Sequence, residues 1–372
     1  MPWKKNANVA MYAGANWSNL IKQVSNTTPQ QARRIALLDP NITFFFYCRQ
    51  PMYLNPLNGN PARQFNTGDA VFFSGEPWYG SAPQCDTYQK DEMSVIYISP
   101  ANAQQFQNIA CYQTANGLPA IDVVSLFGGN YASDVLPYLR ANNNNPPTQQ
   151  PLNDNILQVL TNGSVKYLQD KGITVLLTIL NGWQPVGWSE FTNQKDATDF
   201  AAYLKKDIID LYGLDGIDID DEYSTGAANN TSLPMITTIM RQMMPDKIIS
   251  KALWSDYGPF SGSWNGHTLA QNLNYGWEMS YYGGGPDSRL SPYLGYGMNK
   301  NQLVLGFSAE SRFQSQWSTV GPVSEEIVKE GYEGGMMFDF ENQPASLGLM
   351  ENMVNALCGP GNWNVDPNCK LQ

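Results

Sequence analysis

The chain has 372 residues, of which 15% are charged and 12% are aromatic, and its formal net charge is −11. This length allows one large domain with an appendage, or two domains. The acidic charge and the lack of a basic stripe argue against nucleic acid as a partner, and no apolar run reaches the roughly 18 residues that indicate a membrane span.

The composition favours a class of ligand and a compartment. The chain is polar and poor in charge, yet it carries 10 Trp and 20 Tyr. Aromatic faces stack on pyranose rings, so this composition is typical of a secreted protein that binds neutral sugars. The first residues lack the apolar core of a signal peptide, which leaves a mature secreted form and a cytoplasmic protein both open. We expect a secreted monomer.

Two β-like segments lie in the first quarter of the chain. Residues 41–47 and 69–73 are rich in Phe and Val, and Pro, Gly and Asn separate them. They predict a small β-rich appendage over residues 1–92. We interpret it as a structural cap on the main domain, with a carbohydrate-binding unit as the alternative. A competing alignment would make Phe44–Tyr47 the first strand of the main domain.

From residue 93 onward, short apolar strands alternate with helical patterns. The clearest helix covers Lys195–Tyr212, and Gly213 follows it as a C-cap. Eight such units predict an α/β fold, a (β/α)8 TIM barrel over residues 93–372, with its active site at the carboxyl ends of the strands. The expected strands are Met93–Ser99, Ile121–Gly128, Ile173–Leu180, Leu214–Asp220, Lys247–Trp254, Trp277–Tyr282, Leu303–Ser308 and Gly335–Phe340. Further expected helices are Asn155–Asp170, Met235–Met244 and Ala345–Leu357.

A row of acids ends the fourth expected strand, in the segment LDGIDIDDEY. Asp218, Asp220 and Glu222 share one parity and point to one face. Asp215 and Asp221 have the opposite parity. Carboxylates on one strand face repel each other, so the row indicates a functional site, with a solvated acidic loop or a cation site as the alternative.

The row suits the cleavage of a glycosidic bond, which needs a proton for the leaving oxygen and a group that stabilises positive charge. Glu222 reaches furthest into the cleft and is the expected general acid, with a pKa raised by the neighbouring carboxylates. Asp220 can accept a hydrogen bond from the substrate, and Asp218 can share a proton with Asp220. One His and no Cys-x-x-Cys leave little room for a zinc site, and we predict no metal or other cofactor.

This motif resembles the catalytic signature of glycoside hydrolase family 18, and it is most similar to the endo-β-N-acetylglucosaminidase group, where an acid precedes the Glu and a Tyr follows it. The resemblance implies substrate-assisted, retaining hydrolysis of the GlcNAc-β1,4-GlcNAc bond in N-glycan cores, so that N-glycans or glycoproteins are the partners. It also implies that Asp215 is structural, that Asp218 and Asp220 relay and orient, and that Glu222 is the acid.

Segments after other strands extend the resemblance. Tyr281 stands in the family's M-x-Y pattern and would bind the acetamide carbonyl. Phe338, on the last strand, would form the floor under the reacting sugar, where chitinases carry Trp and the endoglycosidases carry Tyr. The other residues implied to bind substrate are Tyr282, Asn181, Trp183, Gln184, Phe127 and Asn130.

Two alternatives stay open: a chitinase of the same mechanism that acts on chitin oligomers, and a glycan-binding member without turnover. The missing Trp at Phe338 weighs against the first, and the presence of Glu222 weighs against the second.

Several residues outside the motif also receive predictions. Trp183 and Trp188 are either loop anchors or site residues, Trp254, Trp264 and Trp277 are expected in the core, Glu310 and Arg312 as a surface pair, and Cys48–Cys85 and Cys358–Cys369 could each close a loop.

Overall fold

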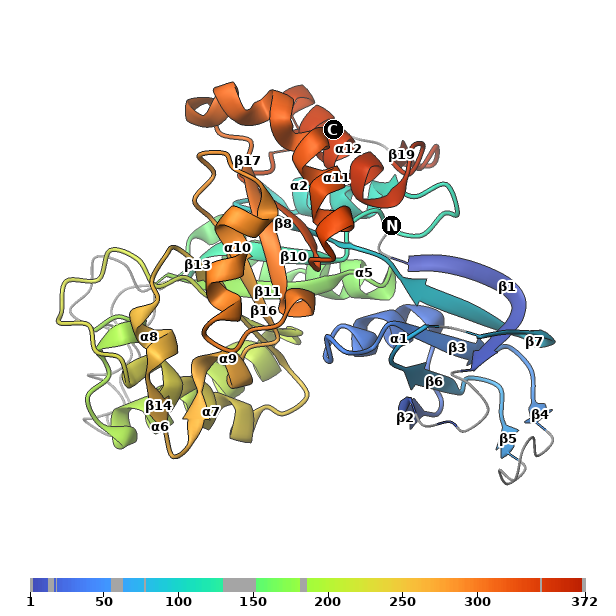
Figure 1. The fold of residues 1–372 in the computed structure, drawn as a ribbon, viewed down its shortest axis with the longest axis horizontal. Coiled ribbons are helices and arrows are strands. Elements are labelled where there is room, and N and C mark those ends of the chain that lie inside the picture. Colours follow the sequence, from blue (N-terminus) through green and yellow to red (C-terminus); the bar gives the residue numbers. More distant parts are fainter. Residues whose placement is uncertain are drawn as a thin grey trace.

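A computed structural model describes residues 3–12, 17, 19–54, 63–76, 78–129, 152–180, 186–341 and 343–369. It contains an eight-stranded closed barrel and, beside it, a five-stranded antiparallel sheet (Figure 1). The predicted fold class, a TIM barrel with a β-rich N-terminal appendage, is confirmed. No helix among the described residues is long and apolar enough to cross a membrane.

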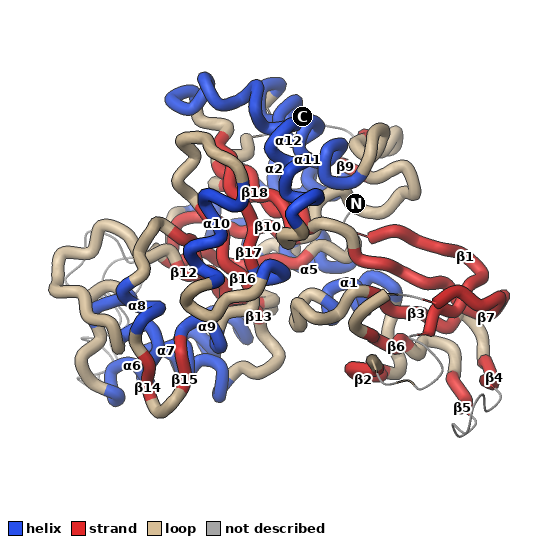
Figure 2. Tube along the Cα trace, in the orientation of Figure 1, coloured by secondary structure: helices blue, strands red, loops and turns tan. Residues whose placement is uncertain are grey.

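The barrel strands pair in parallel in the order β10-β11-β12-β13-β16-β17-β18-β8, and helices surround them (Figure 2). Nearly all of their residues are buried, because the inner side of each strand faces the lumen and the outer side faces helices. The strands are β8 (Met93–Ile98), β10 (Val123–Gly129), β11 (Thr174–Ile179), β12 (Gly216–Ile219), β13 (Ile248–Leu253), β16 (Tyr275–Glu278), β17 (Leu303–Ser308) and β18 (Gly334–Phe338).

The helices between the strands are mostly short. The α-helices are α2 (Ala103–Gln107), α4 (Asp154–Thr161), α5 (Ser164–Asp170), α6 (Gln194–Tyr203), α7 (Ser232–Met243), α8 (Gly258–Ser261), α9 (Leu269–Asn272), α10 (Pro286–Leu294), α11 (Val320–Glu330) and α12 (Pro344–Cys358). The 3-10 helices are η1 (Asn108–Cys111), η2 (Trp188–Glu190), η4 (Lys300–Gln302) and η5 (Ser311–Thr319), and η3 (Leu204–Asp210) is a π-helix. Small strand pairs are β4 (Met52–Leu54) with β5 (Arg63–Phe65), β14 (Ser263–Trp264) with β15 (His267–Thr268), and β9 (Tyr112–Gln113) with β19 (Asn364–Val365).

The N-terminal sheet has the order β1-β7-β3-β6-β2 and carries one helix, α1 (Pro29–Ala36). Its strands are β1 (Trp3–Tyr12), β2 (Leu20–Val24), β3 (Phe44–Cys48), β6 (Ala70–Phe73) and β7 (Trp78–Lys90). The competing alignment of Phe44–Tyr47 is wrong, since β3 pairs with β6 and β7 and not with a barrel strand.

This sheet and its helix dock on the barrel at the amino-terminal ends of the strands. Arg33 faces Asp122 at 3.7 Å and Lys90 faces Glu333 at 2.5 Å, and both acids immediately precede a barrel strand. The hydroxyl of Tyr275, the first residue of β16, donates to the carbonyl of Leu37 at 2.9 Å. The N-terminal part therefore covers the end of the barrel that lies opposite the carboxyl ends of its strands.

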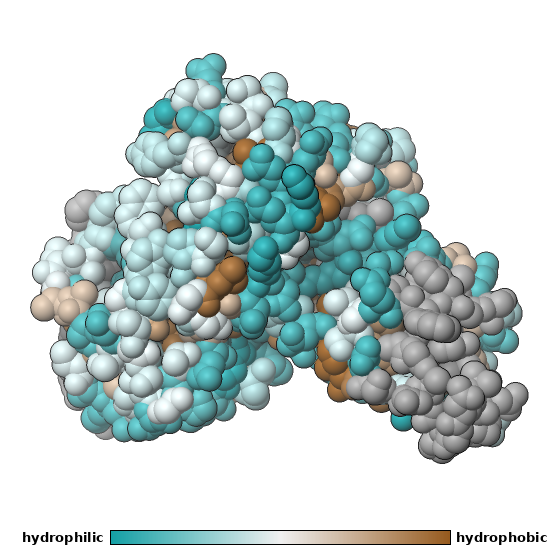
Figure 3. All heavy atoms as spheres, viewed as in Figure 1, coloured by the Kyte–Doolittle hydropathy of each residue, from teal (hydrophilic) through white to brown (hydrophobic). Residues whose placement is uncertain are grey.

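One hydrophobic core runs from the sheet into the barrel lumen. Phe45, Phe72 and Tyr88 of the sheet belong to the same buried cluster as lumen residues such as Val95 and Trp277. The outer surface seen in Figure 3 is mostly hydrophilic, in keeping with this interior placement of the apolar residues. The end of the barrel at the amino termini of its strands, its lower mouth, is closed by side chains of the N-terminal part.

The cysteines pair differently from the prediction. Cys111, at the end of η1, forms a disulfide with Cys369 near the C-terminus, so the Cys358–Cys369 pairing is wrong. Cys358 is free. Cys48 and Cys85 are free thiols that face each other across β3 and β7, with a distance of 3.0 Å between their sulfur atoms.

Candidate active site

The carboxylate of Asp218 lies at the centre of the barrel lumen and is fully buried. One oxygen accepts hydrogen bonds from the Tyr97 hydroxyl at 2.6 Å and from Thr178 at 3.0 Å. The other accepts from Ser250 at 2.8 Å and from the indole N–H of Trp277 at 2.9 Å. Burial raises the pKa of Asp218, and these four donors oppose that shift. The donors hold the carboxylate in a fixed orientation and favour its ionised form.

Asp220 lies one step further up the same face of the strand and is only 3% exposed. Its pKa lies well above the usual value because the carboxyl is buried and because the charges of Glu222 and Asp218 oppose its ionisation. No described group donates a hydrogen bond to its buried Oδ1 atom. A buried oxygen without a donor is costly, so Asp220 is prepared to accept a hydrogen bond from a ligand.

Glu222 is half-buried at the upper rim of the lumen. Its pKa is raised, as the sequence predicted, but the main cause is burial rather than crowding by the other two acids. Nearby positive charges, Lys251 and Arg312, partly oppose the shift. A raised pKa keeps the carboxyl protonated closer to neutral pH, which a general acid requires.

The other two acids of the motif make structural contacts with neighbouring residues. Asp215 lies at the opposite end of β12, where its Oδ2 accepts from the amide of Val175 at 2.9 Å and its Oδ1 binds Arg34 of α1. Asp221 accepts from the amide and hydroxyl of Ser189, in the loop after β11. The first residue of β12 must be small, since a Cβ on Gly216 would lie 2.1 Å from the carbonyl oxygen of Ile248.

Aromatic rings form the wall across the lumen from Glu222. Phe338 stacks on Tyr281 with ring centroids 5.6 Å apart and meets Phe127 edge-on at 5.4 Å. Tyr97 packs 6.2 Å from Phe338, so the donor to Asp218 is part of the same wall. Tyr281 adopts a left-handed backbone with φ +58°, a costly conformation for a non-glycine residue that is concentrated at functional sites. Its pKa is raised well above the usual value, first by burial, so the phenol keeps its proton and can donate.

A cavity of about 470 Å³ opens between this wall and the acids. It brings together the predicted residues Asp220, Glu222, Tyr281, Tyr282, Phe338 and Phe127. Sequence reasoning assigned no site role to the other lining residues, which are Asp221, Tyr223, Trp254, Met279, Arg312 and Phe313. The prediction for Trp254 is wrong, since it is 48% exposed in the cavity, whereas Trp277 is buried as expected.

Some predicted residues cannot be placed in this cavity. Asn130, Asn181, Trp183 and Gln184 lie outside the described residues. Trp188 is a buried loop anchor whose indole N–H donates to the carbonyl of Ile179 at 2.7 Å. Glu310 and Arg312 do pair, with Nη2 2.8 Å from Oε2, and Arg312 also lines the cavity.

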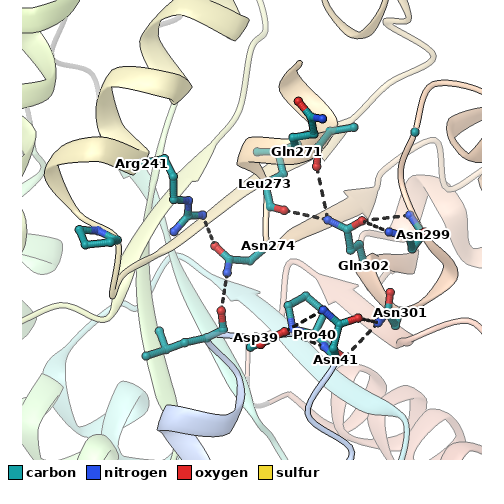
Figure 4. Close-up of a pocket in the computed structure, with 14 residues that line it drawn as sticks. Asp39, Pro40, Asn41, Arg241, Gln271, Leu273, Asn274, Asn299, Asn301 and Gln302 are labelled. Atoms are coloured by element: carbon teal, nitrogen blue, oxygen red, sulfur yellow. Dashed lines mark hydrogen bonds between the residues drawn. The ribbon is translucent and has the colours of Figure 1, made fainter. Parts of the chain in front are cut away.

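A second pocket, of about 400 Å³, lies at the seam between the N-terminal part and the lower end of the barrel (Figure 4). Its amide groups bind one another and the chain: Asn274 donates to the carbonyl of Leu38 at 2.8 Å, and Asn301 donates to that of Pro40 at 3.1 Å. Because these polar groups already have partners, the pocket belongs to the docking contact. In the described part of the chain, no three His, Cys, Asp or Glu side chains are grouped to hold a metal ion.

The barrel and the buried carboxyl row under an aromatic cavity define the class of (β/α)8 glycoside hydrolases. Comparison with known proteins specifies the family. Residues 141–333, just over half of the chain, match the family model of the endo-beta-N-acetylglucosaminidase EndoS TIM-barrel domain. An endo-beta-N-acetylglucosaminidase from a Flavobacterium species is 34% identical over 285 residues, which cover 74% of this chain and 84% of that relative.

A second relative, endo-beta-N-acetylglucosaminidase F1 from Elizabethkingia meningoseptica, is 30% identical over 60% of this chain and 64% of its own length. Among solved structures, Bacteroides thetaiotamicron EndoBT-3987 in complex with Man9GlcNAc2Asn has a TM-score of 0.55 at 17% identity, covering 80% of this chain and 81% of that one. The chain belongs to the endo-β-N-acetylglucosaminidase family of glycoside hydrolases, which confirms the resemblance seen in the sequence.

Proposed function

We propose that the protein hydrolyses the β1,4 bond between the two N-acetylglucosamine residues of N-glycan cores and leaves one N-acetylglucosamine on the asparagine. The observation that carries this proposal is the shared cavity of Glu222, Asp220 and Tyr281. It offers one acid, one buried acceptor and one phenol, the set that a substrate with its own nucleophilic acetamide requires.

The proposed reaction begins with proton transfer from Glu222 to the bridging oxygen. As the bond from that oxygen to the anomeric carbon breaks, the carbonyl oxygen of the 2-acetamido group attacks the same carbon and closes an oxazolinium ring. The Oδ1 atom of Asp220 accepts from the acetamide N–H, and the Tyr281 hydroxyl donates to the acetamide oxygen. These contacts hold the acetamide in line with the reacting carbon.

Water completes the reaction. The Glu222 carboxylate takes a proton from a water molecule, whose oxygen adds to the anomeric carbon and opens the ring, so that the sugar keeps its configuration. Two inversions at one carbon account for the retention. The site needs no metal or nucleotide for either step.

The substrate side of the proposal rests on the relatives. EndoBT-3987 was solved with Man9GlcNAc2Asn and, separately, with a Man5GlcNAc product. N-glycans on glycoproteins are therefore the proposed partners. We further propose that the protein is a secreted monomer, in keeping with its aromatic-rich, charge-poor composition.

The test is mass spectrometry of a high-mannose glycoprotein and of a chitin oligomer, each incubated with the wild type and with Glu222→Gln. We expect the wild type to leave one N-acetylglucosamine on the glycoprotein and the variant to leave the glycan intact. Cleavage of the chitin oligomer alone would make the protein a chitinase. Glycan binding without cleavage by the wild type would make it a glycan-binding protein.

A further inference from the structure

Trp254 is the exposed aromatic residue nearest in the chain to the end of β13, and nearly half of its surface meets solvent in the active-site cavity. Leaving the large apolar face of a tryptophan in water is energetically unfavourable. Among the described residues, no aromatic ring packs against it. Trp254 therefore lines the cavity with about half of its surface exposed.

The strand register places Trp254 beside the general acid. In the parallel pair of β12 and β13, Ile219 lies opposite Lys251. Three residues further along each chain are Glu222 and Trp254, which therefore stand at a similar height on adjacent barrel positions. Phe338, the central ring of the aromatic wall, ends β18, which lies across the barrel from β12. Trp254 thus flanks the side of the cavity from which Glu222 delivers its proton.

An ion pair with a buried lysine fixes the backbone of this tryptophan. The Lys251 side chain is 1% exposed, and its Nζ donates to the carbonyl of Ala252 at 2.7 Å and binds Asp256. The other oxygen of Asp256 accepts the amide N–H of Trp254 at 3.0 Å. Ser255, between them, has φ +52°, and its amide donates to the Tyr293 hydroxyl at 2.9 Å. The turn is therefore held in one conformation before any ligand binds.

We propose that Trp254 stacks on the leaving N-acetylglucosamine, the sugar that stays on the protein substrate, and that the Lys251–Asp256 pair positions it. This inference rests on the proposed function and adds a specificity-determining residue for one side of the scissile bond. The proton of Glu222 goes to the oxygen of the leaving sugar, so that sugar must lie on the Glu222 side. There the indole can cover its apolar face while its hydroxyl groups stay in water.

A sugar oxazoline substrate tests one side of the scissile bond without the other. An N-glycan oxazoline contains the reacting sugar with its ring already closed, and it lacks the leaving sugar. We expect Trp254→Ala to hydrolyse the oxazoline at the wild-type rate. We expect its KM for a high-mannose glycopeptide to rise about tenfold, and its transfer of the oxazoline glycan to an N-acetylglucosamine acceptor to fall by a similar factor.

Two variants serve as controls for the tryptophan. Trp254→Phe keeps an aromatic face and should retain most of the transfer activity. Tyr167→Ala removes an exposed aromatic residue of α5 outside the cavity and should match the wild type in all three assays. Equal losses on oxazoline and glycopeptide, or no loss on either, would overturn the inference. A wild type inactive on both would instead overturn the proposed function, and the inference with it.

Asp256 provides the test of positioning. Asp256→Ala removes the acceptor of the Trp254 amide and should raise the KM for glycopeptide. It also removes a charge that raises the pKa of Glu222, and Asp256→Asn removes the same charge, so the two variants should hydrolyse the oxazoline at equal rates. Asp256→Asn keeps a side-chain oxygen in that place and should restore most of the affinity. Failure of Asp256→Asn to improve on Asp256→Ala would overturn the positioning role, and the Trp254 variants decide the stacking role without it.

Discussion

The carboxylate of Asp218 sits on β12 but receives its hydrogen bonds from side chains of four other strands. The acid row was visible in the sequence because its members are two residues apart on one strand. Its donors were not, because Tyr97 and Trp277 are separated from it by 121 and 59 residues and meet it only when the barrel closes. Local spacing holds no signal for such contacts.

Removing one donor should change the pH range of activity. Burial raises the pKa of Asp218, and the hydrogen bond from Tyr97 is the first effect that lowers it. Tyr97→Phe should therefore raise this pKa further, so that Asp218 takes up a proton at a higher pH. We expect the acidic limb of the kcat/KM profile to shift to higher pH and the activity to fall about tenfold or more, since a hydrogen bond to a charged group contributes about 1.5–3 kcal/mol.

A matched variant distinguishes this effect from general damage to the lumen. Tyr275 is another buried tyrosine of the barrel interior, but its hydroxyl binds the Leu37 carbonyl at the lower mouth. Tyr275→Phe should lower the melting temperature without moving the acidic limb. An unchanged limb in Tyr97→Phe would mean that Asp218 does not titrate in this range.

At the level of elements, periodicity located all eight barrel strands within a few residues of their observed bounds. The alternation of short apolar runs with helical patterns carries that information, and Gly213 adopts the positive φ expected of a helix cap. The predicted helix over Asn155–Asp170 is divided into α4 and α5, because Gly163 takes φ +87° between them. Apolar spacing continues across that break, so it gave no warning.

The disulfide pairing could not be predicted from spacing at all. Cys111 and Cys369 are separated by 258 residues and meet because the C-terminal strand β19 pairs with β9, directly after η1. Short-range closure favoured Cys358 as the partner of Cys369. The fold of the last residues places Cys369 beside Cys111 instead.

We expect Cys369→Ser to lower the free energy of unfolding by about 2–4 kcal/mol, since the crosslink restricts the unfolded chain over most of its length. Chemical denaturation followed by circular dichroism measures this loss, and a reductant should destabilise the wild type to the same degree. Cys358→Ser, which alters a free thiol, is the control and should leave the midpoint unchanged. Equal stability of wild type and Cys369→Ser in oxidising buffer would contradict the assigned pairing.

At the scale of the whole molecule, the N-terminal part is tied to the barrel by charge as well as by packing. Arg34 of α1 binds Asp215, the first acid of the motif, and Arg33 and Lys90 face other buried acids. The sequence indicated a β-rich unit here and favoured a structural cap over a carbohydrate-binding unit. Neither the shared core nor these ion pairs could be foreseen, because they join residues more than 85 positions apart.

A shared core predicts a single unfolding transition. Phe45→Ala should cost about 3–5 kcal/mol through the cavity that it leaves between sheet and barrel. Tryptophan fluorescence and far-ultraviolet circular dichroism should report the same shifted midpoint for the entire chain. Tyr53→Ala, at an exposed residue of the β4–β5 hairpin, should leave that midpoint in place. Two separate transitions would show that the sheet and the barrel fold independently.

The closed lower mouth has a practical consequence for anyone who wishes to shorten the enzyme or exchange its parts. Residues 3–90 cannot be removed without exposing the interior of the barrel. Cutting the chain before Met93 would leave an open barrel end lined with Val95, Tyr275 and Trp277, and Asp215 would lose its arginine partner. A chimera with another barrel would have to supply matching apolar side chains and cations at that opening. The natural place to vary this protein is the opposite rim, where the loops can change and the scaffold stays whole.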